Sequence, residues 1–270
     1  MARDLSHDEV SQFARDGVLR LEGLIDRRCV AAARQAVLRP LEKIGLCRDS
    51  DWRLTGRQRP EWPATGLKAR DIGNRHPEVE TLVGLPAVRG VVGRLLDGKA
   101  VDRKVFPRPQ VLASLPNRDR WVVPDSWHTD VPRLASGCSP GVQIFMFLDA
   151  VAAGGGGTVV VAGSHRLLND GRNLRPKEIV SALRPEPYFQ ALFGGRLQEP
   201  GEDALPAGRV GETDLQVMEL VGEPGDAWLM DLRVLHAAAP NASDRPRLMA
   251  TQRFLRADLM PEIAAAFGWT

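Results

Sequence analysis

Several features are scarce in this sequence of 270 residues, and each scarcity excludes a class of protein. Cysteine occurs three times, an odd number without the spacing of a metal site, which predicts free thiols in a reducing compartment. No apolar run is long enough to cross a membrane, and the first residues carry no apolar signal segment. We therefore expect a cytoplasmic protein without a membrane partner.

A charge excess of one sign is also missing. The 36 basic residues nearly balance the 34 acidic ones, and the formal net charge of +2 gives no basis for non-specific binding of nucleic acid. Lysine is rare, so arginine supplies most of the positive charge, a usage typical of a GC-rich bacterial genome. The sequence carries no signal for an oligomeric state.

What is present fits one large domain. A hydrophobic content of 43% supports a sizeable core, and 26% charged residues is ordinary for a soluble protein. All-β barrels and sandwiches often reach this length as one domain. We predict a single domain over residues 1–270, with a helical part over 1–100 and a β core over about 101–256. An excursion over 165–213, polar and rich in glycine and proline, interrupts that core.

Helix signals are concentrated near the amino terminus. Ser6 followed by Glu9 fits a capping box, and Asp16-Gly17 ends the helix that it begins. Asp26 is the expected N-cap of a helix that runs to about Lys43. Further helical segments are predicted over 86–96 and near 176–192, whereas 48–76 has no clear period and is predicted to be a long loop.

The remaining pattern is that of short strands separated by turns. A first strand is predicted over 18–21. The others are expected over 101–106, 109–115, 126–131, 141–149, 157–161, 215–220, 226–231, 233–237 and 247–255.

The tripeptide His128-Thr129-Asp130 is the most informative functional signal. Alternate residues of a strand share one face, so His128 and Asp130 can hold one metal ion together. His236, on a distant strand, would complete a set of two histidines and one carboxylate, which is typical of non-haem Fe(II) oxygenases. The same set also suits catalytic zinc. Arg247, eleven positions after His236, has the planar fork of donors that binds the remote carboxylate of a dicarboxylate cosubstrate.

Four segments in order resemble the phytanoyl-CoA dioxygenase family, whose members are Fe(II)- and 2-oxoglutarate-dependent oxygenases. They are Trp127-His128-Thr129-Asp130, the run GGTVVVAGSH over 156–165, Pro224-Gly225-Asp226, and the run HAAAPNASDRPR over 236–247. The segment from Leu5 to Leu24 also resembles the opening of the family, so the likeness runs with gaps from near residue 5 to about 256. A lone His-x-Asp is a weak signal, but the ordered set is specific.

The resemblance implies a mainly β fold, a double-stranded β-helix (a cupin-like jelly roll) with flanking amino-terminal helices. It implies that His128, Asp130 and His236 ligate Fe(II) and act in catalysis, and that Arg247 binds the far carboxylate of 2-oxoglutarate. Related halogenases have glycine or alanine at the position of Asp130, so a carboxylate there favours hydroxylation over halogenation.

Three further positions follow from the same resemblance. Gln110 resembles a glutamine that family members carry near the cosubstrate, and Ser114 stands where some relatives have asparagine. Ala238 is a departure, because many members have there a serine that assists the arginine. The loss of one neutral hydrogen bond costs about 0.5–1.5 kcal/mol, which would weaken cosubstrate binding without abolishing it.

Several histidine, arginine and tryptophan side chains have ordinary structural interpretations beside the functional ones. His165 is predicted to support the Gly-Ser-His turn rather than to bind metal, and Trp127 to pack beside the metal site. Arg245 is the rival of Arg247 for the cosubstrate and is assigned instead to a turn or a surface ion pair. Trp52 and Trp62 could close over substrate or anchor the loop over 48–76.

The sequence therefore predicts a dioxygenase that takes Fe(II), 2-oxoglutarate and dioxygen and oxidises a small molecule. Hydroxylation in bacterial secondary metabolism is the expected setting. The alternatives are a zinc hydrolase at the same three ligands and a non-catalytic jelly-roll binding module. A nucleic-acid demethylase is disfavoured, because the chain has no basic patch.

Overall fold

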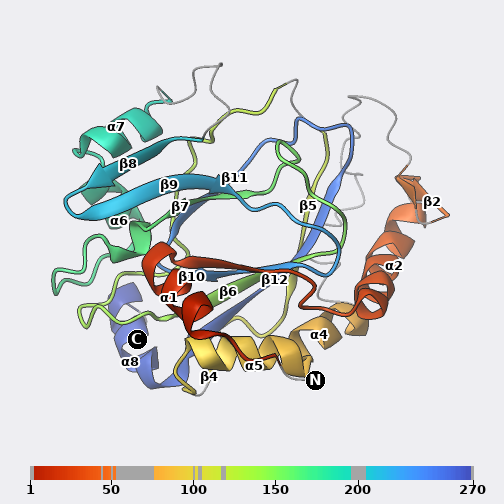
Figure 1. The fold of residues 1–270 in the computed structure, drawn as a ribbon, viewed down its shortest axis with the longest axis horizontal. Coiled ribbons are helices and arrows are strands. Elements are labelled where there is room, and N and C mark those ends of the chain that lie inside the picture. The colour runs from red at the N-terminus through yellow and green to blue at the C-terminus, as the bar shows by residue number, and fades with distance from the viewer. Residues whose placement is uncertain are drawn as a thin grey trace.

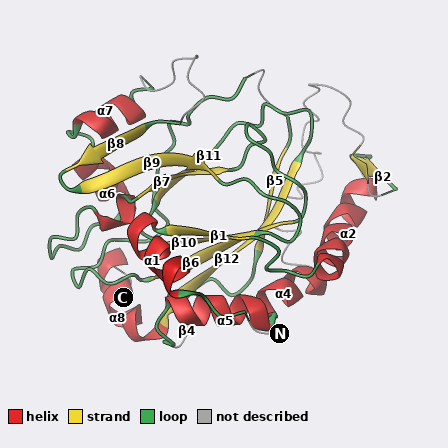
Figure 2. Cartoon of the chain, in the orientation of Figure 1, coloured by secondary structure: helices red, strands yellow, loops and turns green. Residues whose placement is uncertain are grey.

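Two antiparallel β-sheets lie face to face and enclose the central core of the protein (Figures 1 and 2). This computed structural model describes residues 3–43, 45–49, 51–52, 76–99, 101–102, 105–116, 120–195 and 205–268. The large sheet has the order β1-β10-β6-β12-β4, with β5 also paired to β12, and the small sheet has the order β11-β7-β9-β8. Strands β2 and β3 form a separate pair. This arrangement confirms the predicted jelly roll.

The strands are β1 (Val18–Leu21), β2 (Cys47–Arg48), β3 (Asp51–Trp52), β4 (Val101–Asp102), β5 (Gln110–Ser114), β6 (Gly141–Phe147), β7 (Thr158–Ala162), β8 (Ala207–Val210), β9 (Thr213–Glu219), β10 (Ala227–Asp231), β11 (Leu235–Ala238) and β12 (Arg247–Arg256). The helices are α1 (His7–Asp16), α2 (Arg27–Lys43), α4 (Pro77–Gly84), α5 (Pro86–Leu95), α6 (Pro176–Leu183), α7 (Pro187–Phe193) and α8 (Met260–Phe267), with short 3-10 helices over Ser164–Arg166 and Ala257–Leu259.

Strand β6 is buried on both of its faces, which explains its nearly unbroken apolar sequence. Its outward residues, among them Ile144 and Met146, pack with side chains of α2, α4 and α5. Its inward residues Phe145 and Phe147 pack with Val160 of the small sheet. Figure 1 shows α2, α4 and α5 along the outer side of the large sheet. The large sheet therefore has a helical layer behind it and the small sheet in front.

The small sheet is covered on its outer face by α6 and α7. Ile179 and Phe189 from these helices pack against Val161, Val217 and Leu235. Strand β8, which the sequence did not predict, lies at the edge of this sheet and pairs with β9. The excursion predicted over 165–213 is thus partly a helical cover, with residues 196–204 outside the described part.

Most of the predicted amino-terminal elements are confirmed. Ser6 and Glu9 form the capping box of α1, and Gly17 ends this helix with a left-handed φ of 73°. Asp26 accepts a hydrogen bond from the backbone N–H of Arg28 at 2.8 Å, as expected of an N-cap. Strand β1, which follows α1, joins the large sheet beside β10.

Two predicted elements are wrong. Residues 126–131 form no strand, and only an isolated β-bridge joins His128 to His236. The helical segment near 176–192 is two helices, because Pro185 and Pro187 interrupt it and proline cannot continue a helix interior. Helices α4 and α8 were not predicted. Most of the predicted loop over 48–76, with Trp62, lies outside the described residues, while Trp52 in β3 packs against the helical layer.

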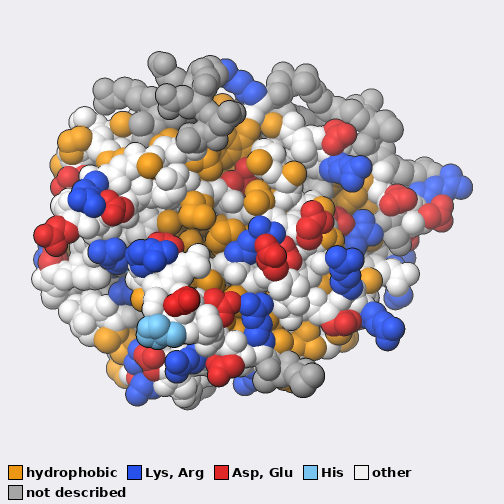
Figure 3. All heavy atoms as spheres, in the orientation of Figure 1, with side chains coloured by type: hydrophobic (Ala, Val, Ile, Leu, Met, Phe, Trp, Pro, Cys, Tyr) orange, Lys and Arg blue, Asp and Glu red, His pale blue; other side chains and the backbone are white. Residues whose placement is uncertain are grey.

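The described surface shows no segregation of charge on the face in Figure 3, where acidic and basic side chains lie next to one another. None of the helices in the described ranges has the length and apolar character that crossing a membrane requires.

Candidate metal centre

The backbone brings His128 and His236 side by side. Each residue donates its backbone N–H to the carbonyl oxygen of the other, with both N···O distances 2.9 Å. This bridge stands in place of the strand predicted over 126–131. Because the backbone at the bridge is extended, the side chains of His128 and Asp130 still point to the same side. His236 is held by β11, whose neighbour is β7.

The three predicted ligands converge. One ligand atom from each of His128, Asp130 and His236 lies within 4.8 Å of the others. The Nδ1 atom of His128 lies 3.0 Å from the carbonyl oxygen of Ser126, and Nδ1 of His236 lies 3.1 Å from that of Val234. A carbonyl only accepts, so each Nδ1 carries a proton, and Nε2 is the nitrogen of each ring that can bind metal. The donor set and its tautomers fit a divalent transition-metal ion.

The electrostatics of the cluster favour metal-binding protonation states. Burial lowers the pKa of His128, and the nearby His236 lowers it further, which favours neutral imidazole. Burial of Asp130 alone would raise its pKa, but hydrogen bonds and charge from His236 and Arg253 hold the pKa far below the usual range. Arg253 donates from Nε to Oδ2 of Asp130 at 2.6 Å. Asp130 is therefore an anionic oxygen ligand beside the imidazoles of His128 and His236.

Arg247 is a buried cation without a carboxylate partner among the described residues. Arg247 is the first residue of β12, and its side chain lies on the same inward face of the strand as Met249. The residue is 7% exposed. Nε has no hydrogen-bond partner, and Nη1 contacts only the sulfur of Met249 at 3.9 Å. Burial lowers the pKa of Arg247 to about 10, with Glu219 opposing that shift. An unpartnered buried guanidinium fits an anionic ligand such as a carboxylate.

Gln110 and Ser114 lie where the sequence places them, on the inward face of β5. Ser114 stands opposite Arg247 in the strand pairing, and Gln110 stands opposite Thr251. Between them Leu112 packs against the core between the sheets, whereas Val111 faces the helical layer. Both predicted residues therefore share the side of the sheet that carries Arg247, although their roles stay predictions.

Asn241, to which the sequence assigned no role, joins three segments around this site. Its Nδ2 donates to the carbonyl oxygens of Ser114 at 3.1 Å and Arg245 at 2.8 Å. Its neighbour Gly156 has a φ of 78°, and a Cβ there would lie 2.9 Å from Cβ of Asn241. The glycine is thus required by both its backbone conformation and the close approach of Asn241.

The Gly-Ser-His turn supports the strand of His236. Ser164 Oγ accepts a hydrogen bond from the backbone N–H of Leu235 at 2.9 Å. His165 is buried, its Nε2 lies 3.0 Å from the carbonyl oxygen of Ala14, and it is not part of the metal cluster. Trp127 packs with Leu235 in the outer core of the small sheet. These contacts agree with the structural role predicted for His165, whereas Trp127 packs with Leu235 on the opposite side of β11 from His236 and not beside the metal cluster.

The glycine run over 154–157 is held by a buried carboxylate. Glu219, at the end of β9, accepts hydrogen bonds from the backbone N–H groups of Gly154 at 2.8 Å and Gly157 at 2.9 Å. Burial raises the pKa of Glu219, and the glycine N–H groups oppose that shift. The run therefore connects β6 to β7 as a loop whose backbone is held by Glu219.

The sequence matches the phytanoyl-CoA dioxygenase (PhyH) family over residues 13–249, which is most of the chain. The chain belongs to this family. Membership makes the protein an Fe(II)- and 2-oxoglutarate-dependent oxygenase, as the resemblance implied. A comparison with curated protein sequences gives no match.

Solved structures share the fold of this PhyH-family protein at low sequence identity. The non-haem α-ketoglutarate-dependent carbocyclase SnoK from nogalamycin biosynthesis is 18% identical with a TM-score of 0.59, covering 94% of this chain and 85% of SnoK. EctD from S. alaskensis with bound Fe is 16% identical with a TM-score of 0.57, covering 94% of this chain and 78% of EctD. The epimerase SnoN with Fe3+, α-ketoglutarate and nogalamycin RO is 16% identical with a TM-score of 0.55, covering 93% and 83%.

Sequence reasoning on this PhyH-family chain missed Arg253, which contacts the predicted ligand Asp130. The signal was available, because Arg253 lies six positions after Arg247 on one strand and residues an even number apart share a face. Glu219 was also missed, since nothing in its local sequence shows that it meets the glycine run.

Proposed function

We propose that this protein uses Fe(II), 2-oxoglutarate and dioxygen to hydroxylate a small organic molecule. The observation that carries the proposal is the convergence of His128, Asp130 and His236 within 4.8 Å, with Nδ1 of each histidine held by a backbone carbonyl so that Nε2 is left for a metal ion. The buried, unpartnered Arg247 supplies the second element that such an enzyme requires, a fixed cation for the cosubstrate.

Each residue has a distinct role in this proposal. Nε2 of His128 and of His236, with the carboxylate of Asp130, would hold the iron on one face and leave its other face for ligands. Iron with bound 2-oxoglutarate and dioxygen supplies the oxidation of an unactivated carbon–hydrogen bond. Arg247 would bind the far carboxylate of 2-oxoglutarate and so fix the orientation of the cosubstrate.

Gln110 and Ser114 would line the space of the cosubstrate from β5. Ser114, opposite Arg247, stands beside the proposed far carboxylate, while Gln110 lies toward the other end of the strand. Position 238 shares the face of His236, and because it is alanine it offers no hydroxyl to Arg247. The site would therefore hold 2-oxoglutarate through Arg247 with less hydroxyl support than many relatives have.

The substrate class and setting are also part of the proposal. SnoK is described as a carbocyclase from nogalamycin biosynthesis and SnoN as an epimerase in complex with nogalamycin RO, and these similarities support a small-molecule substrate in secondary metabolism. Retention of a carboxylate at Asp130 supports hydroxylation over halogenation. The three cysteines, free within the structure, support a reducing cytoplasm.

The test is an anaerobic titration of metal-free protein with Fe(II) and then 2-oxoglutarate. We expect the weak visible charge-transfer band of an iron chelate in the wild type and in His7→Ala, whose exposed histidine lies in α1. We expect no band in His236→Ala, and no turnover in His128→Ala or Asp130→Ala.

The contrary results separate the alternatives. Folded wild-type protein that binds iron without forming the band would favour the zinc hydrolase. Protein that binds no metal would favour the binding module. Full turnover by Asp130→Ala would show that the ligand assignment is wrong.

A further inference from the structure

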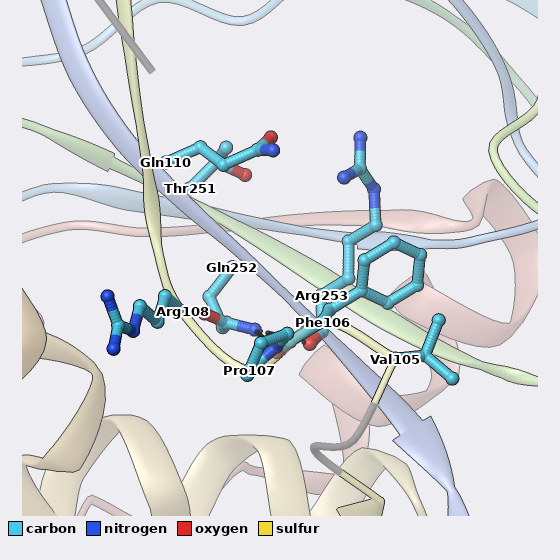
Figure 4. Close-up of a pocket in the computed structure, with 8 residues that line it drawn as sticks. All are labelled: Val105, Phe106, Pro107, Arg108, Gln110, Thr251, Gln252 and Arg253. Atoms are coloured by element: carbon cyan, nitrogen blue, oxygen red, sulfur yellow. Dashed lines mark hydrogen bonds between the residues drawn. The ribbon is translucent and has the colours of Figure 1, made fainter. Parts of the chain in front are cut away.

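A pocket opens along one edge of β12, at residues that pair with no strand on that edge in the part of the chain that the structure describes. Strand β12 pairs with β5 through residues 247–251 and with β4 through residues 255–256, which leaves residues 252–254 between them. The pocket has a volume of about 490 Å³ and lies in this gap. That volume is in the range of small-molecule sites. Its lining comprises Val105, Phe106, Pro107, Arg108, Gln110, Thr251, Gln252 and Arg253 (Figure 4).

Arg253 joins this pocket to the metal cluster. Its Nε donates to Oδ2 of Asp130 at 2.6 Å, and the same oxygen lies 3.5 Å from Nε2 of His236. The guanidinium carbon lies 5.0 Å from the ring centroid of Phe106, so a cation–π contact fixes its plane. The Arg253 side chain is 18% exposed. Asp130 and Phe106 therefore fix the position of the Arg253 guanidinium. Because Arg253 lines the pocket, the guanidinium can contact a molecule bound there.

Two groups in the pocket have unused donors. Only Nε of Arg253 has a hydrogen-bond partner among the described residues, so both terminal amino groups remain available. The side-chain amide of Gln110 likewise has no partner in the described part of the chain. Figure 4 shows the Gln110 amide and the Arg253 guanidinium directed to the same side of β12, whereas Gln252 points to the other side. Polar groups that converge without partners indicate a ligand.

The charge of the pocket defines the class of that ligand. Its described lining contains Arg108 and Arg253 and no acidic residue. Asp130, the acid nearest to Arg253, would be committed to the metal ion in the loaded enzyme. The two terminal amino groups of a guanidinium form a flat fork that matches the two oxygens of a carboxylate.

We propose that this pocket binds the prime substrate and that Arg253 receives a carboxylate of that substrate beside the metal centre. The inference rests on the proposed function and extends it from a small molecule to a carboxylate-bearing one. Because Arg253 also holds Asp130, the carboxylate of the substrate is fixed at a constant distance from the ligand set. This arrangement determines which carbon lies next to the metal.

The experiment compares hexanoate with hexanamide, two probes of the same length that differ in charge. Each is titrated into the anaerobic complex of enzyme, Fe(II) and 2-oxoglutarate, and the shift of the visible band reports binding. We expect hexanoate to bind at least about tenfold more tightly than hexanamide in the wild type. Arg253→Gln should retain the band and lose this preference, and Arg253→Lys should retain part of it. Arg209→Gln, a change of an exposed arginine on β8, serves as the control.

Two results would overturn the proposal. The first is a wild-type complex that forms the band and does not distinguish the two probes, or responds to neither. The second is Arg253→Gln protein that keeps the full preference for hexanoate. If the variant that keeps the preference also has a 2-oxoglutarate requirement raised tenfold or more, the fork would be assigned to the cosubstrate. Failure of the proposed function is separate, because the wild type would then form no band at all.

Discussion

Arg247 is the side chain whose environment least resembles that of an ordinary arginine. A buried cation without a counter-ion is costly, and burial has already lowered the pKa of Arg247 to about 10. At neutral pH the group is still charged, so the start of β12 carries a cation that no carboxylate among the described residues pairs with. A bound carboxylate would remove that cost, which is the physical reason to assign the cosubstrate to Arg247 rather than to the exposed Arg245.

Removal of Arg247 should therefore act mainly on 2-oxoglutarate. We expect Arg247→Ala to raise the 2-oxoglutarate requirement by about 10- to 150-fold, because a hydrogen bond to a charged group is worth about 1.5–3 kcal/mol. Ala238→Ser, which restores the hydroxyl that many relatives have, should act in the opposite direction by about 2- to 12-fold. The measurement is a titration of the visible band with 2-oxoglutarate.

Arg245→Ala is the matched control for Arg247→Ala, since the two arginines lie two positions apart and only Arg247 is buried. If Arg245→Ala raised the 2-oxoglutarate requirement and Arg247→Ala did not, the assignment of the two arginines would be reversed.

At the scale of single elements, the turn between β10 and β11 determines where His236 lies. Strand β10 belongs to the large sheet and β11 to the small one, so the chain crosses between the sheets over residues 231–235. Asp231 is 2% exposed and pairs with Arg233 through Nε at 2.9 Å and Nη2 at 2.8 Å. Arg233 in turn donates to the carbonyl oxygen of Gly137 at 2.6 Å. The ion pair thus fixes the crossing that leads into the metal ligand.

Asp231→Asn should destabilise the fold by about 3–5 kcal/mol, because it leaves Arg233 as an unpaired buried charge near Arg133. Burial alone would raise the pKa of Asp231, but Arg233 lowers it to about 2. Since this value lies below that of an unfolded aspartate, about 3.9, the pair stabilises the fold above about pH 4. Its contribution is lost as pH falls toward 2.

Urea unfolding at pH 7 and between pH 4 and 2 measures both effects of Asp231→Asn. Asp214→Asn, which removes the exposed partner of Arg209, is the control and should change stability little. Equal effects of the two substitutions, or an unchanged loss of stability below pH 4 in Asp231→Asn, would contradict the role of the buried pair.

The elements also show how far sequence reasoning reaches. Local signals identified the capping box at Ser6, the turn at Gly17 and most core strands, because caps, turns and alternation act over a few residues. The segment over 126–131 was wrongly predicted as a strand. Its backbone pairs with His236 through a single bridge at His128 and does not form a continuous ladder. Contacts such as Arg253 with Asp130 or Glu219 with the glycine run depend on the register between strands, which a single sequence does not specify.

For the molecule as a whole, the candidate site lies where three distant segments meet. His236 comes from the small sheet, Arg253 from the large sheet, and His128 with Asp130 from the segment before β6. The order of the ligands along the chain allowed them to be predicted from the family pattern. Their convergence results from the closure of two sheets around a shared core that includes Phe145 and Val160.

Metal binding should therefore stabilise the whole fold, because one ion would join the small sheet to the segment before β6. At a hundred times its dissociation constant, Mn(II) should raise the free energy of unfolding by about 2.7 kcal/mol. For a chain of this size that corresponds to an increase in Tm of roughly 5–10 °C. Calorimetry of metal-free protein with and without Mn(II) measures the shift. His7→Ala should retain the shift and His236→Ala should lose it. A shift of equal size in both variants would mean that the ion binds elsewhere, since only His236 belongs to the cluster that links the two segments.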